Sequence, residues 1–211
     1  MNKSDINVVR PKNLGWLEYK LTSKEMDYVW RCIENKKEKL NARLAGNISS
    51  SHVLMDRGDW FFLNTVKPLV DKYREEWENI GASLPTNQQH PYHMSSWWVN
   101  YQNQTEFNPL HKHSGVYSFV LWMKIPTSFS DQKKKAIAAQ INDNSISNFL
   151  FHYLNILGQS MSYNYEMSPG CEGTMIFFPS QLLHVVYPFY DCDEDRISVS
   201  GNVSLNTTKI I

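Results

Sequence analysis

The sequence predicts a mainly β fold of the α+β class, in which two N-terminal helices support a sandwich or jelly roll of short strands. Apolar residues recur every three or four positions through about the first ninety residues, and every second position from about residue 94. Aromatic residues form 13% of the chain, and most of them lie in short β-like runs separated by turn signals. Many short strands with few helices between them indicate a sandwich, a barrel or a jelly roll.

The chain length points to a single domain. A length of 211 residues suits one hydrophobic core, and the sequence contains neither an evident internal repeat nor a linker. We therefore expect one domain over residues 1–211, with mainly helical support in residues 1–90 and the β core in residues 91–211.

The first predicted helix starts at a capping box. Thr22 and Glu25 have the spacing of this motif, and Leu21 and Met26 flank it as a hydrophobic staple. From there the apolar residues fall mostly on one helical stripe, which ends near Gly46, where a C-cap belongs. The residues of this stripe are Met26, Val29, Trp30, Ile33, Leu40 and Leu44.

The second predicted helix carries apolar residues spaced by threes and fours and stops at Gly81. Pro68 must either kink this helix or lie in its first turn. Both helices are apolar on one side only, so we expect each to lie against a sheet. The apolar residues of the second helix are Phe62, Val66, Leu69, Tyr73, Trp77 and Ile80.

The β core is predicted from runs that alternate or are rich in β-branched and aromatic residues. A polar stretch, residues 127–148, interrupts them as an insertion, with one short helix expected around Ala136–Ile141. We expect this insertion to be a mobile flap near the pocket mouth, because long loops in such folds often serve function. The predicted strands are Trp97–Tyr101, Val116–Ile125, Phe149–Leu154, Met175–Phe178, His184–Tyr187 and Arg196–Val203.

Composition argues against several classes of protein. Lys plus Arg and Asp plus Glu both total 21, so no basic excess favours a nucleic-acid partner. The lysine-rich runs Lys36–Lys39 and Lys133–Lys135 are typical of solvated surface. We expect no signal peptide and no membrane span. Three cysteines without paired spacing argue against disulfides and zinc ribbons, so a reducing, cytoplasmic setting is expected.

Three of the seven histidines stand out by position. His111 and His113 are two residues apart, so on an extended segment both rings face the same side. His184 begins another predicted strand 73 positions later. Imidazole binds Fe(II), Zn(II), Cu and Ni alike, so the ligand type alone does not identify the metal. The alternative is that His111 and His113 only form hydrogen bonds within a turn after Asn108–Pro109.

Arg196 is a candidate anion-binding residue. It opens a predicted strand twelve residues after His184, and alternation puts Arg196, Ser198 and Ser200 on one face. A buried, unpaired arginine is costly, but its guanidinium matches a carboxylate through two parallel hydrogen bonds, and Ser198 could add a third donor. The alternative is a surface arginine paired with the acidic residues just before it, Asp193, Glu194 and Asp195.

Together these motifs resemble the Fe(II)/2-oxoglutarate-dependent oxygenase superfamily. The sequence looks most like small microbial and phage-type members of this superfamily. The resemblance covers roughly residues 94–203. Its strength lies in the order and spacing of four short motifs. These motifs are Trp98–Tyr101, Asn108–His113, the run from Gly173 to His184, and Arg196–Asn202.

The resemblance implies a double-stranded β-helix (jelly roll, cupin-like) flanked by the two helices. It also implies that Fe(II) is held by His111, His113 and His184, and that the co-substrate 2-oxoglutarate is gripped through its far carboxylate by Arg196 and Ser198. Tyr101 would reach the co-substrate, although core packing explains it equally well.

The sequence departs from the common family pattern at one ligand. His113 stands where the family usually has the carboxylate of a two-histidine, one-carboxylate site, so either His113 or a nearby carboxylate such as Glu106 completes the site. Three-histidine sites also occur in thiol dioxygenases of the cupin class, which need no 2-oxoglutarate. A non-catalytic jelly-roll binding module is the third alternative.

The resemblance implies hydroxylation of a C–H bond, with release of succinate and CO2. The substrate is expected to be a peptide or protein side chain or a small metabolite, and neither nucleic acid nor membrane is an expected partner. Lys124 either assists Arg196 or marks the end of its strand, and we favour the strand end. For a phage-encoded protein the expected location would be the host cytoplasm.

Overall fold

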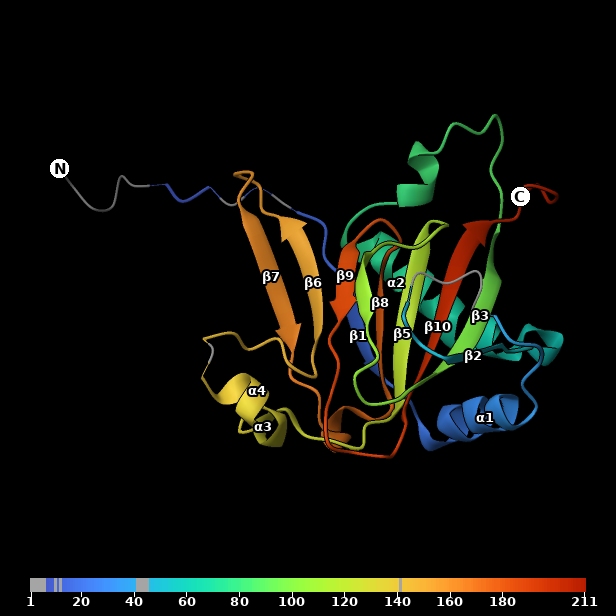
Figure 1. Cartoon of the computed structure of the whole chain (residues 1–211). Coiled ribbons are helices and arrows are strands. Elements are labelled where there is room, and N and C mark those ends of the chain that lie inside the picture. The colour runs from blue at the N-terminus through green and yellow to red at the C-terminus, as the bar shows by residue number, and fades with distance from the viewer. Residues whose placement is uncertain (1–6, 10, 12, 41–45, 141) are drawn as a thin grey trace.

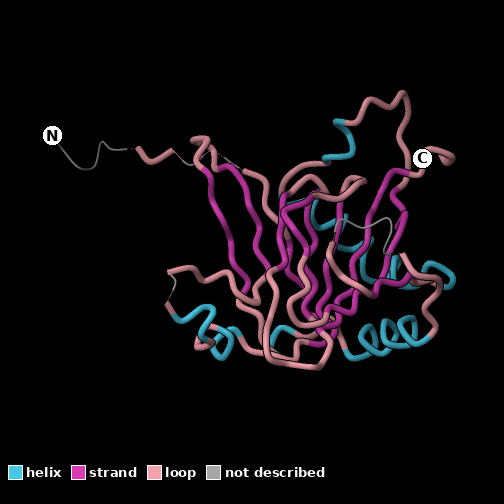
Figure 2. Tube along the Cα trace, in the orientation of Figure 1, coloured by secondary structure: helices cyan, strands magenta, loops and turns pink. Residues whose placement is uncertain are grey.

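The computed structural model describes residues 7–9, 11, 13–40, 46–140 and 142–211. Its strands form two antiparallel sheets that face each other as a double-stranded β-helix (Figure 1, Figure 2). The large sheet has the order β1 (Leu17–Lys20), β8 (Thr174–Pro179), β5 (Tyr117–Lys124), β10 (Arg196–Leu205), β3 (Tyr92–Gln102) and β2 (Ser50–Val53). The small sheet has the order β4 (Asn108–His111), β9 (Leu183–Val186), β6 (Phe149–Leu154) and β7 (Ser160–Tyr165).

The first helix begins as predicted but ends early. In α1 (Ser23–Glu34) the capping box is present, because the backbone N–H of Thr22 donates to Glu25 Oε2 at 2.8 Å while the Thr22 side chain accepts from the Glu25 N–H. The predicted extension to Gly46 is wrong. The six residues between Ile33 and Leu40 are all polar, and Leu40 instead donates its N–H to Ser51 in β2. Leu44 lies outside the described residues.

The second helix changes its winding along its length. A π-helical turn, η4 (Phe62–Val66), leads without a break into α2 (Lys67–Glu76), and Pro68 lies in the first turn of α2, next to this change of winding. The predicted end at Gly81 is wrong, because Trp77 leaves helical geometry. Further short 3-10 turns are η3 (Arg57–Asp59), η5 (Ile80–Ser83) and η6 (Pro169–Cys171).

Two apolar layers explain the patterns of the large sheet. One face packs on the helices, where Val29, Val70 and Tyr73 meet Phe119 and other residues of the sheet. The opposite face packs on the small sheet, through residues such as Val120 and Trp122 of β5 and Phe149 and Phe151 of β6. Because β5 is buried on both faces, it reads as a continuous apolar run.

The insertion over residues 127–148 is anchored in the core at its C-terminal end. It contains α3 (Phe129–Gln132) and α4 (Ala136–Ala139), and its last four residues, 145–148, are buried. Asn148 accepts a hydrogen bond from the backbone of Met167 at 3.0 Å, which fixes this end in the core. No described residue of the insertion lines the cavity discussed below.

Four strands were not predicted: β1, β2, β4 and β7. Two of them, β1 and β2, come from the first ninety residues and form the two edges of the large sheet, so this part of the chain is not only a helical support. None of the described helices is long and apolar enough to cross a membrane.

Candidate metal centre

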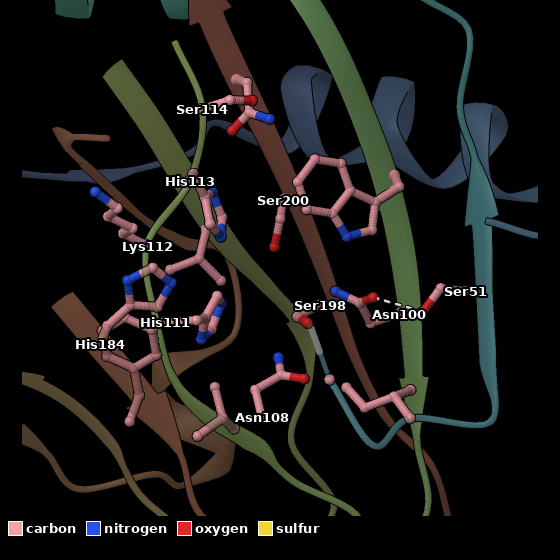
Figure 3. Close-up of a pocket in the computed structure, with 17 residues that line it drawn as sticks. Ser51, Asn100, Asn108, His111, Lys112, His113, Ser114, His184, Ser198 and Ser200 are labelled. Carbon is pink, nitrogen blue, oxygen red and sulfur yellow. Dashed lines mark hydrogen bonds between the residues drawn. The ribbon is translucent and has the colours of Figure 1, made fainter. Parts of the chain in front are cut away.

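A cavity of about 210 Å³ opens between the two sheets. The large sheet contributes side chains from β2, β3, β5 and β10, and the small sheet contributes side chains from β4, β6 and β9. Its apolar residues include Trp98, Val120, Phe149 and Val186. Figure 3 shows three histidines on one wall and Ser198, Ser200 and Asn100 across from them.

The three histidines come together because β4 pairs with β9. His111 and His184 are directly opposite each other in this ladder. His113 follows two residues after His111, and its backbone N–H donates to Ser180 at 2.9 Å. One ligand atom from each ring lies within 4.8 Å of the others. This arrangement could hold a metal ion.

Backbone carbonyls orient two of these rings. The Nδ1–H of His111 donates to the carbonyl of Pro109 at 2.7 Å, and the Nδ1–H of His184 donates to the carbonyl of Leu182 at 3.0 Å. A carbonyl can only accept, so Nδ1 carries the proton and Nε2 keeps its lone pair for a metal. Nδ1 of His113 is buried and has no hydrogen-bond partner among the described residues.

The three imidazoles are held in the neutral form. Burial lowers the pKa of His113 to about 4, and the neighbouring His111 adds to this shift. Burial also lowers the pKa of His111, and it lowers the pKa of His184 well below its ordinary value. Neutral imidazole is the form that binds metals, so the cluster is ready to bind a cation at neutral pH.

Arg196 is buried near this cavity, and no acidic side chain of the described residues pairs with it. Its side chain is 2% exposed, and its guanidinium lies 5.0 Å from the ring of Phe189. Nη2 donates to the carbonyl of Ser147 at 2.7 Å and to its hydroxyl at 2.8 Å. Nε and Nη1 are buried and have no partner among the described residues. Burial lowers the pKa of Arg196 to about 10.

The alternative of a surface arginine is therefore wrong. Glu194 pairs instead with Lys124 at 2.8 Å, and Asp193 accepts from Gln104 at 2.9 Å. Lys124 ends β5 and is 39% exposed, which agrees with the strand-end interpretation.

The sequence comparison decides the family. The profile described as "Putative 2OG-Fe(II) oxygenase" matches residues 96–202, slightly more than half of the 211 residues. The chain belongs to this family. It is therefore an oxidoreductase that depends on Fe(II) and 2-oxoglutarate. A search of curated proteins found no significant match.

One solved structure supports the fold of this oxygenase, and two further structures are similar to it more distantly. It is similar to a prolyl-4-hydroxylase from Pseudomonas putida, with 15% identity, a TM-score of 0.50, and coverage of 89% of this chain and 91% of that one. It is also similar to a viral collagen prolyl hydroxylase from Paramecium Bursaria Chlorella virus-1, with 11% identity, a TM-score of 0.49, and coverage of 89% and 94%. HygX from Streptomyces hygroscopicus gives 8% identity, a TM-score of 0.48, and coverage of 92% and 84%.

The residues present fit the cofactor and co-substrate of the family. Three neutral imidazoles suit Fe(II), and a buried guanidinium with unused donors suits a carboxylate of 2-oxoglutarate. Arg196 itself does not line the cavity, but Ser198, the next residue on the same strand face, does. Along a strand this step is about 7 Å.

Tyr101 lies on the other face of the sheet, so the expectation that it reaches the co-substrate is corrected. Its partner across the ladder is Ile197, whereas Arg196 and Ser198 face Gln102 and Asn100. The Tyr101 ring lies 6.2 Å from the ring of His52, outside the cavity. Side chains opposite each other in a ladder share a face, so a correct pairing of the two strands would have identified Asn100 instead.

Glu106 does not belong to the histidine cluster. Its two carboxylate oxygens accept from the backbone N–H groups of Ser49 at 3.0 Å and Asn103 at 2.9 Å. Among the described residues, no Asp or Glu side chain joins the three histidines. Trp98, Asn100 and Asn108 also line the cavity and were not predicted to do so, although the first two share the strand face of Ser198.

Proposed function

We propose that this oxygenase hydroxylates a C–H bond of an amino-acid side chain or a small metabolite, with release of succinate and CO2. The observation that carries the proposal is a cluster of three neutral imidazoles in a cavity that leads toward a buried arginine with unused donors. The family assignment supports the same chemistry.

In this proposal His111, His113 and His184 hold the iron. Hydrogen bonds to backbone carbonyls preset the rings of His111 and His184, so little reorganisation is needed on binding. When bound, Fe(II) and 2-oxoglutarate together supply the oxidising chemistry, in which O2 is reduced, 2-oxoglutarate loses CO2 and the substrate gains an oxygen atom.

In the same proposal Arg196 and Ser198 bind the far carboxylate of 2-oxoglutarate. Nη2 of Arg196 already contacts Ser147, so Nε and Nη1 are the donors left for the carboxylate. Val120, Phe149 and Val186 line the cavity and exclude water from the reacting groups. The protein therefore contributes the positioning of the co-substrate, a positive charge for its carboxylate and the exclusion of water.

The test is an anaerobic titration of the Fe(II)-loaded protein with 2-oxoglutarate, followed by visible absorption. We expect a charge-transfer band that saturates at one equivalent of 2-oxoglutarate. A thiol dioxygenase would use the same three histidines but would show no such band, and a non-catalytic binding module would hold no redox-active metal. The absence of the band in protein with one iron per chain would contradict the proposal.

The ligand assignment has a separate test. We expect His184→Ala to abolish stoichiometric iron binding, because one of three ligands is removed. His152→Ala is the matched control, since His152 lies on a neighbouring strand, β6, outside the cluster. If the His184 variant kept one tightly bound iron per chain, the assignment would be wrong.

A further inference from the structure

The wall of the cavity carries no acidic side chain among the described residues that line it. Among the described residues that line the cavity, Lys112 is the one charged side chain apart from the histidines. Arg196, which is buried nearby, adds a second positive charge. An ammonium or guanidinium group brought into this space would lose its hydration and find no acidic side chain among these residues, which is costly. The remaining polar groups are neutral: Ser51, Asn100, Asn108, Ser114, Ser198, Ser200 and Asn202.

Asn100 is the most firmly held of these neutral groups that still has an unused donor. Its side chain is 5% exposed, and its Oδ1 accepts a hydrogen bond from the Ser51 hydroxyl at 2.7 Å. Ser51 is 1% exposed and lies directly opposite Asn100 in the β2–β3 ladder. This bond fixes the orientation of the amide, so that its carbonyl side faces β2.

The other end of the amide is a free donor. Nδ2 of Asn100 has no hydrogen-bond acceptor among the described residues. Figure 3 shows this nitrogen pointing away from Ser51, into the cavity, with the three histidines on the opposite wall. Asn202, by contrast, uses both ends of its amide, on Ser118 and Ser96.

We propose that Asn100 determines substrate specificity by donating a hydrogen bond to an sp² oxygen of the substrate, an amide carbonyl or a carboxylate. The cavity thereby selects neutral or anionic substrates over cationic ones. The proposal rests on the proposed function for the identity of the site, since it places the substrate between Asn100 and the histidines. A lysine-like side chain is therefore excluded as the target.

The key variant is Asn100→Asp, which keeps the size of the side chain. The Ser51 hydroxyl can donate to a carboxylate oxygen as it does to the amide oxygen, so the local fold is retained. The change replaces the cavity donor by a negative charge. The matched control is Asn103→Asp, the same change three positions away in the sequence, on an exposed residue whose amide bonds to Ser49.

The probes are three capped amino acids that differ in side-chain charge: N-acetylglutaminamide, N-acetylglutamic acid amide and N-acetyllysinamide. Binding is measured by tryptophan fluorescence, because Trp98 lines the cavity, with anaerobic protein carrying Fe(II) and 2-oxoglutarate. We expect the wild type to bind the neutral and anionic probes at least about tenfold more tightly than the lysine probe, the size of one charge-assisted contact. Asn100→Asp should reverse this order, and Asn103→Asp should leave it unchanged.

Several results would overturn the inference. These are a preference of the wild type for the lysine probe, an unchanged order in Asn100→Asp, and failure of all three probes to bind. If Asn100→Asp instead weakened only 2-oxoglutarate binding, the amide would serve the co-substrate and not the substrate. The binding measurements are repeated on protein without iron and 2-oxoglutarate. The charge preference of the cavity wall depends on neither, so this repeat tests the role of Asn100 separately from the proposed oxygenase function.

Discussion

At the residue scale, the site depends on buried polar groups that the protein leaves unpaired. Within the described part of the chain, two guanidinium nitrogens of Arg196 and one buried ring nitrogen of His113 have no hydrogen-bond partner. Such groups cost free energy in the ligand-free protein, because each gives up its hydrogen bonds to water. In the proposed function, the free nitrogens of Arg196 are the groups that the far carboxylate of 2-oxoglutarate would satisfy.

The first prediction concerns Arg196. If it binds the far carboxylate, Arg196→Leu should raise the Kd for 2-oxoglutarate by roughly thirtyfold to several-thousandfold, equivalent to about 2–5 kcal/mol. Arg196→Lys should recover part of this loss, because the charge is kept while the planar guanidinium is lost. The measurement is anaerobic titration of each variant, with iron content as the control, since the proposed iron ligands are unchanged. A Leu variant within threefold of the wild type would remove the assignment.

The second prediction concerns pH and the metal-free protein. The folded-state pKa of His113 is about 4, whereas its ordinary value is 6.5. Between these values the unfolded chain binds more protons than the folded one, so stability should fall as the pH falls from about 6.5 toward 4. For His113 alone the loss is at most about 3 kcal/mol. Urea unfolding across this range should show the slope, and His113→Gln should flatten it; equal slopes would contradict the prediction.

At the element scale, the first helix is tied to the sheet through Glu25. Its carboxylate accepts from the Thr22 hydroxyl at 2.7 Å, the Tyr19 hydroxyl at 2.9 Å and the Thr65 hydroxyl at 2.7 Å. One side chain thus joins β1, the capping box of α1 and the π turn before α2. Burial alone would raise the pKa of Glu25, but hydrogen bonds from Thr22 and Thr65 outweigh it and lower the pKa.

The third prediction concerns these hydrogen bonds of Glu25. Glu25→Ala should lower the free energy of unfolding by about 2–4 kcal/mol, because several buried hydroxyls lose a charged acceptor. Since the pKa of Glu25 is lowered, the difference from wild type should be present at neutral pH and shrink in acid, below the ordinary value of 4.5. The measurement is urea unfolding, with Glu34→Ala, an exposed change in the same helix, as the control. If both variants lost the same free energy of unfolding, the hydrogen bonds of Glu25 would not contribute as predicted.

At the scale of the whole molecule, the site joins the two sheets. The histidines belong to the small sheet and the turn that follows β4, whereas Asn100, Ser198 and Arg196 belong to the large sheet. A ligand that contacts both walls should therefore stabilise the packing of one sheet on the other.

The fourth prediction is a thermal shift on ligand binding. With Fe(II) and no oxygen, 2-oxoglutarate at about 100 times its Kd should add about 2.7 kcal/mol of stability. For a chain of this size that corresponds to a rise in Tm of roughly 5–10 °C. The measurement is anaerobic thermal unfolding with and without 2-oxoglutarate, and Arg196→Leu should lose the shift at the same concentration. A wild-type Tm that does not respond to 2-oxoglutarate would contradict binding across the two walls.

Much of the molecule could be predicted from local sequence signals. Alternating runs and runs rich in β-branched and aromatic residues after residue 94 predicted six strands of the core, and the capping box located the start of α1. Both signals depend only on residues close together in the sequence, so they predict local structure without knowledge of the tertiary contacts. The spacing His111-x-His113 with a distant His184 predicted the cluster, since residues two apart on an extended segment face one side.

What the tertiary structure decided was pairing. The β10–β3 register shows that Asn100 shares the cavity face with Ser198 and that Tyr101 does not. Alternation along one strand fixes only that these two neighbours face opposite sides, and the packing of the sheets decides which side is the cavity. The contact between Arg196 and Ser147 also could not be predicted, because Ser147 lies 49 positions earlier, in the polar insertion. Short edge strands such as β1 and β2 carry little apolar pattern of their own and form because a partner strand supplies the hydrogen bonds. Local sequence patterns identified six strands, the start of α1 and three candidate metal ligands. Contacts between distant segments, which no local pattern encodes, brought the side chains of the site together.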